Sequence, residues 1–303
     1  MEELSLVSVV IVTYNSASTI VETLDSIYEQ TYKKIELVIS DDCSTDSTLS
    51  ICEEWIEGHR DRFENVRLLK VEKNTGISAN LNRAIREAGG VWIKSLAGDD
   101  LLAPNCIDEC FTFVKREKAQ ICMVRLHLFD GDETYNREFE ISLDNDMYRF
   151  LRMNNREDQY RRVLYKHILP GPGIFYSKEL WKVIGGFDEK YPNFEEYSFE
   201  LKVLEREKVY FLDKPLVWWR QRDGSLTHSP KSQATWEDIL FFKKVRRPLL
   251  IKNHQFLHFI DASVFYLLKE RIEFNNASQL YKLLWLFSPL AYIRIIKSFR
   301  HIV

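Results

Sequence analysis

The chain has 303 residues, of which 45% are hydrophobic and 29% charged, and a formal net charge of -3. This balance excludes a disordered or collagen-like chain, and the length suits one large domain with an appendage, which we expect, or two unequal domains. The five cysteines show neither a CxxC pair nor zinc-ligand spacing, so reduced thiols are expected. Residues 1–4 lack the basic and apolar stretches of a secretory signal, which predicts a cytoplasmic location.

Four strand and helix units occupy the first hundred residues. Residues 7–12 form a continuous apolar, β-branched run, typical of a strand buried on both faces of a parallel sheet. Ser18 is expected to cap the helix that follows, because a serine oxygen accepts hydrogen bonds from unpaired N–H groups of the first turn. Further strands are predicted at 35–40, 66–71 and 91–96, and helices around 49–56 and at 78–88. This alternation predicts an α/β fold with a doubly wound, mostly parallel sheet.

The pattern loosens after residue 103. A helix is predicted at 104–118, a strand at 121–129, a helix at 195–207 and short strands at 209–212 and 215–219. We therefore expect one domain over 1–228, divided into a first half (1–103) and a mixed α+β second half (104–228). A helical C-terminal extension is expected over 229–303.

The last part of the chain differs from the rest in charge. Residues 235–303 contain eleven Lys and Arg against five Asp and Glu, among clusters of Phe, Leu and Trp. Their longest uncharged stretch, 283–293, is too short to span a bilayer, which takes about twenty apolar residues. We expect an amphipathic helix over 283–296 that makes a peripheral contact with an anionic membrane. The alternative is that the C-terminal helices pack on the domain or form a homodimer.

Polar or turn-forming residues directly follow each of the four predicted strands. In an open parallel sheet, the loops at the carboxyl ends of the strands converge, and ligands bind there. We therefore predict a ligand site at this edge, made by Thr13, Tyr14, Asn15, Asp41, Asp42, Asn74, Gly76, Asp99 and Asp100.

Asp99 and Asp100 indicate the chemistry of this site most sharply. Adjacent carboxylates repel each other unless a cation or hydrogen bonds compensate, and a hard divalent ion with oxygen ligands is the natural partner. Such an ion neutralises a diphosphate and stabilises it as a leaving group. The chain has no GxxxxGK loop, no GxGxxG after the first strand and no GxSxG elbow, which disfavours a Rossmann dehydrogenase.

A set of motifs carries a resemblance to a known family. It consists of Val9-Val10-Ile11-Val12-Thr13-Tyr14-Asn15, Leu24-Asp25-Ser26-Ile27, Gln30-Thr31-Tyr32, residues 39–48 (ISDDCSTDST), Asn74-Thr75-Gly76-Ile77-Ser78 with Asn82, Asp99-Asp100, Gly185-Gly186-Phe187-Asp188 and Glu195-Glu196. Over roughly residues 6–228, the sequence resembles the family-2 inverting glycosyltransferases of the GT-A fold, of the type that builds bacterial surface polysaccharides.

The resemblance implies that the first half of the domain binds a nucleotide-diphosphate sugar, usually one of uridine. It places the base and ribose at Thr13, Tyr14, Asp41 and Asp42, with further contacts from Asn15, Asn74, Gly76 and Asn82. The family's acidic triplet for metal and diphosphate aligns with residues 97–99, where Ala97 replaces the first acid. Asp99 remains the matching ligand of Mn²⁺ or Mg²⁺, with Asp100 beside it.

In the same way, the resemblance places the acceptor and the general base in the second half. The family's Glu-Asp pair aligns with Glu195-Glu196, so we predict Glu196 as the base and Glu195 as the alternative, although Glu replaces Asp here. Arg220, Arg222 and His228 lie where the family has a flexible basic loop over the diphosphate.

The implied reaction is a single displacement that inverts the anomeric carbon. The acceptor is expected to be a glycan, in particular a lipid-linked one, at the inner face of the cytoplasmic membrane, and no nucleic acid partner is expected. Two alternatives stay open. A non-catalytic nucleotide-sugar-binding protein would explain Ala97 and Glu196, and a nucleotidyltransferase also binds a nucleotide and a metal. The latter enzymes usually carry a Gly-rich basic loop after the first strand, whereas this chain has Tyr14-Asn15-Ser16-Ala17.

Overall fold

A computed structural model describes residues 4–130, 139–140, 145–191, 194–221 and 237–273. The chain forms two compact units. The first comprises Met1–Tyr160 and His167–Thr227, and the second comprises Arg161–Lys166 and His228–Val303. The domain boundary predicted at residue 228 lies outside the described residues.

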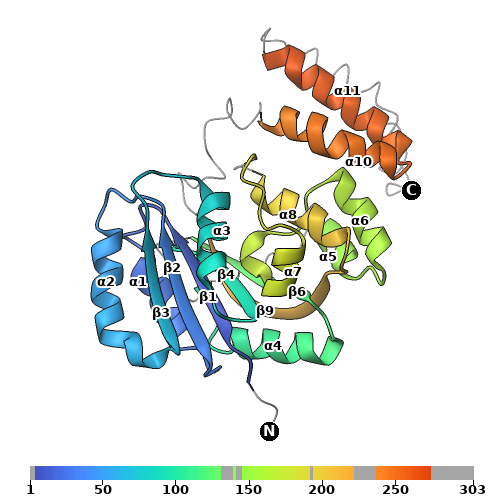
Figure 1. The fold of residues 1–303 in the computed structure, drawn as a ribbon. Coiled ribbons are helices and arrows are strands. Elements are labelled where there is room, and N and C mark those ends of the chain that lie inside the picture. Colours follow the sequence, from blue (N-terminus) through green and yellow to red (C-terminus); the bar gives the residue numbers. More distant parts are fainter. Residues whose placement is uncertain (1–3, 131–138, 141–144, 192–193, 222–236, 274–303) are drawn as a thin grey trace. The chain divides into compact units, whose positions relative to one another are not determined.

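A nine-stranded sheet forms the centre of the first unit, in the order β3-β2-β1-β4-β8-β6-β9-β5, with β7 beside β6 (Figure 1). β1, β2, β3 and β4 run parallel to one another, β8 is antiparallel to β4 and β6, and β9 is parallel to β6. The predicted mostly parallel sheet is therefore confirmed. Its strands are β1 (Val7–Thr13), β2 (Ile35–Asp41), β3 (Asn65–Lys70), β4 (Trp92–Ala97), β5 (Leu101–Leu102), β6 (Ile121–Asp130), β7 (Phe139–Glu140), β8 (Ile174–Ser177) and β9 (Tyr210–Gln221).

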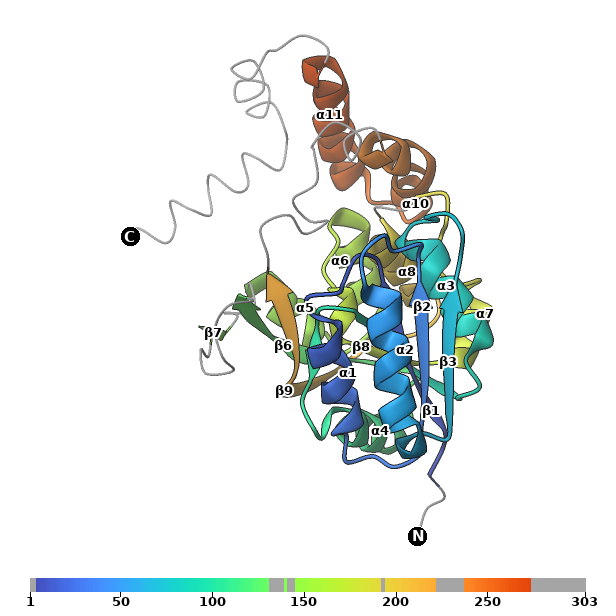
Figure 2. The ribbon, with the colours of Figure 1, turned by 90° about the vertical axis from the view of Figure 1, so that its left-hand side faces the viewer.

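Helices cover both faces of the parallel part of the sheet. α1 and α2 lie side by side on one face, and α3 packs on β1 and β2 from the other (Figures 1 and 2). Every residue of β1 and β2 is buried as a result, which explains the apolar, β-branched runs at the centre of both strands. The helices are α1 (Ile20–Tyr28), α2 (Thr48–His59), α3 (Ile77–Glu87), α4 (Cys106–Glu117), α5 (Asn145–Leu151), α6 (Arg156–Tyr165), α7 (Lys178–Val183) and α8 (Glu195–Leu204), with 3₁₀ turns η1 (Arg60–Arg62) and η2 (Gly171–Gly173).

The start of α1 differs from the prediction. The helix begins at Ile20, so Thr19 rather than Ser18 holds the cap position. The Thr19 hydroxyl does not cap the helix but donates a 2.8 Å hydrogen bond to the carbonyl of Gly98. The Thr19 hydroxyl thus bonds to a distant carbonyl instead of capping its own helix, and this contact connects α1 to the loop after β4.

Two strands predicted separately form one. Residues 210–212 and 215–219 belong to a single strand, β9, which pairs with β6 through an irregular step at Pro215. A proline cannot donate a backbone hydrogen bond to a neighbouring strand, which suits it to an irregularity of this kind. The interruption between the two predicted strands is therefore an irregularity within one strand.

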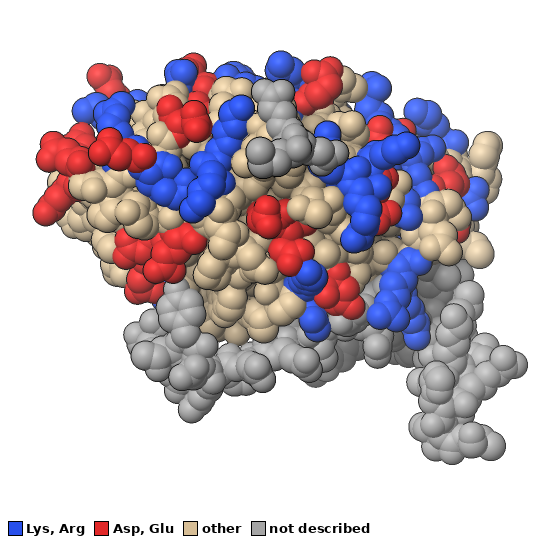
Figure 3. Space-filling model, turned by 90° about the horizontal axis from the view of Figure 1, so that it is seen from below, with Lys and Arg blue, Asp and Glu red and all other residues tan. Residues whose placement is uncertain are grey.

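Charges on the described surface are mixed. In Figure 3, the face seen from below carries Lys and Arg side chains interspersed with Asp and Glu. Exposed ion pairs such as Arg67 with Glu87 (3.1 Å) and Arg116 with Glu117 (2.8 Å) add little stability. The overall charge of -3 thus hides many compensated charges.

The second unit contains helices organised around a buried arginine. They are the π-helical turn η4 (Phe242–Arg246), α10 (Arg247–Lys252) and α11 (Phe256–Glu273). Arg246 donates hydrogen bonds to the carbonyl of Leu164 (3.3 Å) and to the hydroxyl of Tyr266 (3.1 Å), which in turn donates to Asp238 (2.6 Å). Among the described helices of either unit, none is long and apolar enough to cross a bilayer. The amphipathic helix predicted over 283–296 lies outside the described residues.

Candidate functional site at the carboxyl edge of the sheet

The ends of β1 and β2 lie next to each other. Thr13 and Asp41 are register partners, and the Thr13 hydroxyl donates a 3.1 Å hydrogen bond to the Asp41 carboxylate. The same carboxylate accepts from the backbone N–H of Ser44 at 2.8 Å and from its hydroxyl. Two predicted site residues are thus brought together, and the turn after β2 is folded around a buried carboxylate.

Asn15 shapes the loop after β1. Its φ of 53° is left-handed, a conformation that asparagine tolerates better than most residues. Its N–H donates to the Ser44 hydroxyl and its side-chain oxygen accepts from the N–H of Thr45, both at 2.8 Å. The neighbouring Tyr14 is 50% exposed, so an aromatic ring at the strand end is available to stack on a nucleobase.

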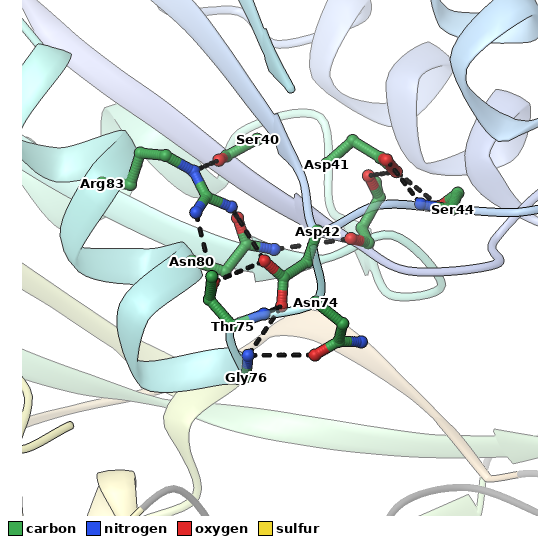
Figure 4. A network of polar contacts seen from close by, with 10 residues as sticks. Ser40, Asp41, Asp42, Ser44, Asn74, Thr75, Gly76, Asn80 and Arg83 are labelled. Atoms are coloured by element: carbon green, nitrogen blue, oxygen red, sulfur yellow. Dashed lines mark hydrogen bonds and ion pairs between the residues drawn. The ribbon is translucent and has the colours of Figure 1, made fainter. Parts of the chain in front are cut away.

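Asp42 holds the loop between β3 and α3 (Figure 4). Its carboxylate accepts hydrogen bonds from the N–H groups of Thr75 (2.9 Å) and Gly76 (2.7 Å) and from the Thr75 hydroxyl (2.6 Å). Gly76 has a φ of 85°, which favours glycine, and its N–H also reaches the side-chain oxygen of Asn74 at 3.0 Å. The structure therefore gathers three predicted site residues, Asp42, Asn74 and Gly76, into one network.

Arg83 also belongs to this network, although it was not among the predicted site residues. Its guanidinium donates to Asp42 (3.1 Å), to the side-chain oxygen of Asn80 (2.7 Å) and to the hydroxyl of Ser40 (3.0 Å), as Figure 4 shows. The half-buried cation compensates the buried charge of Asp42. In the sequence, Arg83 lies one helical turn after Asn80 on α3, directly after the loop of Asn74 and Gly76. This spacing could have identified it as a member of the site.

Asp99 and Asp100 follow β4, next to the end of β1. The N–H of Gly98 donates to the carbonyl of Val12 at 3.0 Å. The Asp100 side chain is buried and accepts a 2.9 Å hydrogen bond from the backbone N–H of Arg220. Burial, reinforced by the charge of Asp99, raises the pKa of Asp100 well above its usual range. Asp99 is only half-buried, so its side chain is the more accessible of the two.

Arg220 differs from the prediction. It lies at the end of β9 rather than in a flexible loop, and it is buried. Its guanidinium donates to the Glu22 carboxylate (2.5 Å) and to the carbonyl of Asp99 (2.8 Å), and lies over the ring of Phe129. Through these contacts, Arg220 holds the backbone of Asp99 in place. Arg222 and His228, the other predicted basic residues, lie outside the described residues.

The Asn82 side chain contacts the loop after Gly186. Its amide nitrogen donates to the carbonyl of Phe187 (2.9 Å) and to Glu189 (2.8 Å), and its oxygen accepts from the N–H of Phe187 (3.0 Å). The side chain is buried. Its amide therefore holds this loop, and a contact of Asn82 with the nucleotide sugar stays a prediction.

Glu195 and Glu196 occupy the first turn of α8, and both are half-buried. One oxygen of Glu196 accepts a 2.7 Å hydrogen bond from the N–H of Gly171, and the other lies 3.2 Å from Nε2 of His167. Lys94, buried in the middle of β4, donates to the carbonyl of Pro172 in the same turn. The turn η2 thus connects the carboxylate of Glu196 to the strand that leads to Asp99.

These residues can bind a divalent ion only if a bound diphosphate and water supply its other ligands. No group of three or more His, Cys, Asp and Glu side chains that could hold a metal occurs in the described parts of the chain. Nucleotide-binding Mg²⁺, however, usually takes one or two carboxylates and completes its shell with phosphate oxygens and water. Asp99, half-buried at the strand end, suits an ion that arrives with a diphosphate.

Comparison with known proteins yields consistent matches. The profile of "Glycosyl transferase family 2" matches residues 8–185, more than half of the chain. Glycosyltransferase GlyG of Streptococcus pneumoniae is 26% identical over 283 residues, which cover 91% of this chain and 88% of GlyG. S. aureus TarS 1–349 in complex with UDP-GlcNAc has a TM-score of 0.64 at 20% identity, covering 93% of this chain and 79% of that one. Mannosyltransferase PcManGT from Pyrobaculum calidifontis, in complex with GDP-Man and Mn²⁺, has a TM-score of 0.56 at 19% identity, covering 99% and 83%.

The sheet, the polar residues along its carboxyl edge and these matches define a glycosyltransferase of the GT-A fold. The predicted fold class and the prediction of a transferase enzyme are thereby confirmed. The chain belongs to glycosyl transferase family 2.

Proposed function

We propose that the protein is an inverting glycosyltransferase that moves a sugar from a UDP sugar to a hydroxyl group of a glycan. One observation carries the proposal. Lys94 of β4 binds the carbonyl of Pro172, and the adjacent Gly171 donates to Glu196. One turn thereby connects β4, which leads to Asp99, with Glu196. Asp99 is suited to a diphosphate and its metal, and the carboxylate of Glu196 is suited to take up a proton.

In the proposed step, the acceptor oxygen attacks the anomeric carbon as the bond from that carbon to the diphosphate oxygen breaks. Glu196 takes the proton of the acceptor hydroxyl, and the electron pair of the broken bond leaves with the diphosphate. Each oxygen of a carboxylate has two lone pairs, and the contacts to Gly171 and His167 use one on each oxygen. A lone pair therefore remains for the acceptor, and no covalent enzyme intermediate is required.

Mn²⁺ or Mg²⁺ forms part of this proposal. An ion shared by Asp99 and the diphosphate would neutralise the charge of the leaving group. The hydrogen bond from Arg220 to the carbonyl of Asp99 keeps the end of β4 in place for this role. The presence of Mn²⁺ with GDP-Man in PcManGT supports the use of a metal.

Transfer assays with the purified protein and a panel of nucleotide sugars test the proposal. We expect transfer to a glycan, or slow hydrolysis without one, with UDP sugars and with a divalent metal. The complex of TarS with UDP-GlcNAc supports uridine as the nucleotide. A protein that binds UDP sugars but neither transfers nor hydrolyses them would contradict the proposal.

The proposed acceptor is a lipid-linked glycan at the inner face of the cytoplasmic membrane. The surplus of basic residues after 235 supports a membrane contact, as do Phe256 and Leu257 at the start of α11, which are 55% and 56% exposed. We expect the full chain to sediment with anionic vesicles but not with neutral ones, and to be released by about 0.5 M salt, which screens surface charge. Replacement of Lys282, Arg294 and Lys297 by Gln should weaken this binding. Equal sedimentation with both vesicle types, or none, would leave packing or dimerisation as the role of the tail.

Gly171→Ala is expected to lower kcat about tenfold or more in a folded protein. A Cβ atom there would lie 2.5 Å from an oxygen of Glu196, so the carboxylate has to move. The φ angle of Gly171 is not positive, and the backbone therefore tolerates alanine. Gly58→Ala is the matched control, because its Cβ would meet nothing within 4 Å. Wild-type kcat in Gly171→Ala would contradict the role proposed for Glu196.

A further inference from the structure

His167 lies between two glutamates of α8. Its Nδ1 is 2.8 Å from Glu200 and its Nε2 is 3.2 Å from Glu196. Glu200 is fully buried and also accepts from the N–H groups of Ile168 and Leu169, both at 3.2 Å. The Glu196 side is more open, with 36% of the imidazole and 34% of the Glu196 side chain exposed. One nitrogen of the ring is therefore anchored in the interior, and the other faces the proposed base.

The surroundings of His167 favour its protonated form. Partial burial acts to lower the pKa of His167, but hydrogen bonds to Glu196 and Glu200, with their charges, outweigh it and raise the pKa to about 10. These two glutamates are the charged groups that face the imidazole, and the ring of Tyr197 on the same helix packs 5.5 Å from it. Burial also raises the pKa of Glu200, which the hydrogen bond from His167 opposes. At neutral pH, an imidazolium therefore bridges the two carboxyl groups.

We propose that His167 is a positioning residue: anchored by Glu200, it fixes the carboxylate of Glu196 in the orientation in which that group accepts the proton of the acceptor. This inference rests on the proposed function, in which Glu196 is the base. The motifs of the family resemblance do not include His167 or Glu200.

His167 does not itself remove the proton, because an imidazolium has no free lone pair. It has two N–H groups, and these donate to two different glutamates. A neutral imidazole has a single N–H and can donate to only one of them. Loss of the proton from His167 therefore releases one glutamate, and the rate should fall with it.

Kinetics of His167→Gln and Glu200→Gln, with magnesium, test this inference. A glutamine is neutral, and it presents a single amide nitrogen where the imidazolium presents two, Nδ1 to Glu200 and Nε2 to Glu196. We expect kcat of His167→Gln to fall about tenfold or more, with KM for the UDP sugar within about threefold of wild type. In wild type the rate should decline on the alkaline side as His167 loses its proton. In Glu200→Gln that decline should begin about one pH unit lower, because one carboxylate that favours the imidazolium is lost.

The control is His59→Gln, which replaces a histidine that stacks on Trp55 at the end of α2, and its kinetics should match wild type. His167→Lys keeps a cation with three N–H groups and should retain more activity than His167→Gln. It serves as the second variant if His167→Gln does not fold. Wild-type kcat in a folded His167→Gln, or an alkaline decline that does not move in Glu200→Gln, would overturn the inference. If Glu196→Gln is active, Glu196 is not the base and the inference fails with that role. If the wild-type protein neither transfers nor hydrolyses UDP sugars, the proposed function itself fails. If Glu196→Gln is impaired but a folded His167→Gln is like wild type, the inference alone fails.

Discussion

Glu196→Gln is expected to bind the UDP sugar as wild type does and to transfer it at least about a hundredfold more slowly, the usual scale for the loss of a general base. An amide nitrogen cannot accept a proton, and a glutamine has only one acceptor oxygen. That oxygen can satisfy the N–H of Gly171 or that of His167, but not both in their present positions. Calorimetry with UDP and initial rates of UDP release separate binding from turnover.

Glu195→Gln is the matched comparison, because this residue precedes Glu196 in the same first turn of α8. It should keep most of the activity. If Glu195→Gln is the impaired variant and Glu196→Gln is active, the base is Glu195, the alternative that the sequence left open. Normal rates in both variants would show that neither glutamate at the start of α8 is the base.

The carboxyl edge of the sheet could be predicted because its signals are local. Apolar β-branched runs bounded by polar residues identify β1 and β2, and parallel strands bring their carboxyl ends to one edge. The adjacency of Thr13 and Asp41 then follows from the register of these strands. The same argument places Asp42 beside the loop of Asn74 and Gly76, as the hydrogen bonds from Thr75 and Gly76 to Asp42 show.

Contacts between distant segments could not be predicted in this way. His167 meets Glu200 across 33 residues, and Lys94 meets Pro172 across 78. A lysine in the middle of a predicted buried strand indicates a polar contact, because a buried ammonium needs hydrogen-bond acceptors. The sequence does not say which segment supplies those acceptors. A motif likewise identifies the position of a residue but not the direction in which its side chain points. Asn82 and Arg220 were predicted to contact the ligand from such positions, and both side chains are buried.

In the proposed function, metal-dependent binding of UDP requires one of the two carboxylates after β4 to reach the ion. The Asp99 backbone, rather than its side chain, accepts the hydrogen bond from Arg220, so a change of the Asp99 side chain leaves this support intact. Asp100, by contrast, uses its carboxylate to accept the N–H of Arg220. Of the two side chains, that of Asp99 can therefore be altered without removing the hydrogen bonds between Arg220 and this loop.

Asp99→Asn is expected to abolish the gain in UDP affinity that Mn²⁺ provides, a loss of about tenfold or more, while the unfolding temperature stays near that of wild type. A neutral amide is a far weaker ligand than a carboxylate for a hard divalent ion, and the diphosphate would lose its link to the protein. Calorimetry with UDP, in Mn²⁺ and in chelator, measures the gain directly. Asp61→Asn, an exposed carboxylate of η1, is the control and should retain it. A metal-dependent gain that persists in Asp99→Asn but is lost in Asp100→Asn would assign the ion to Asp100 instead.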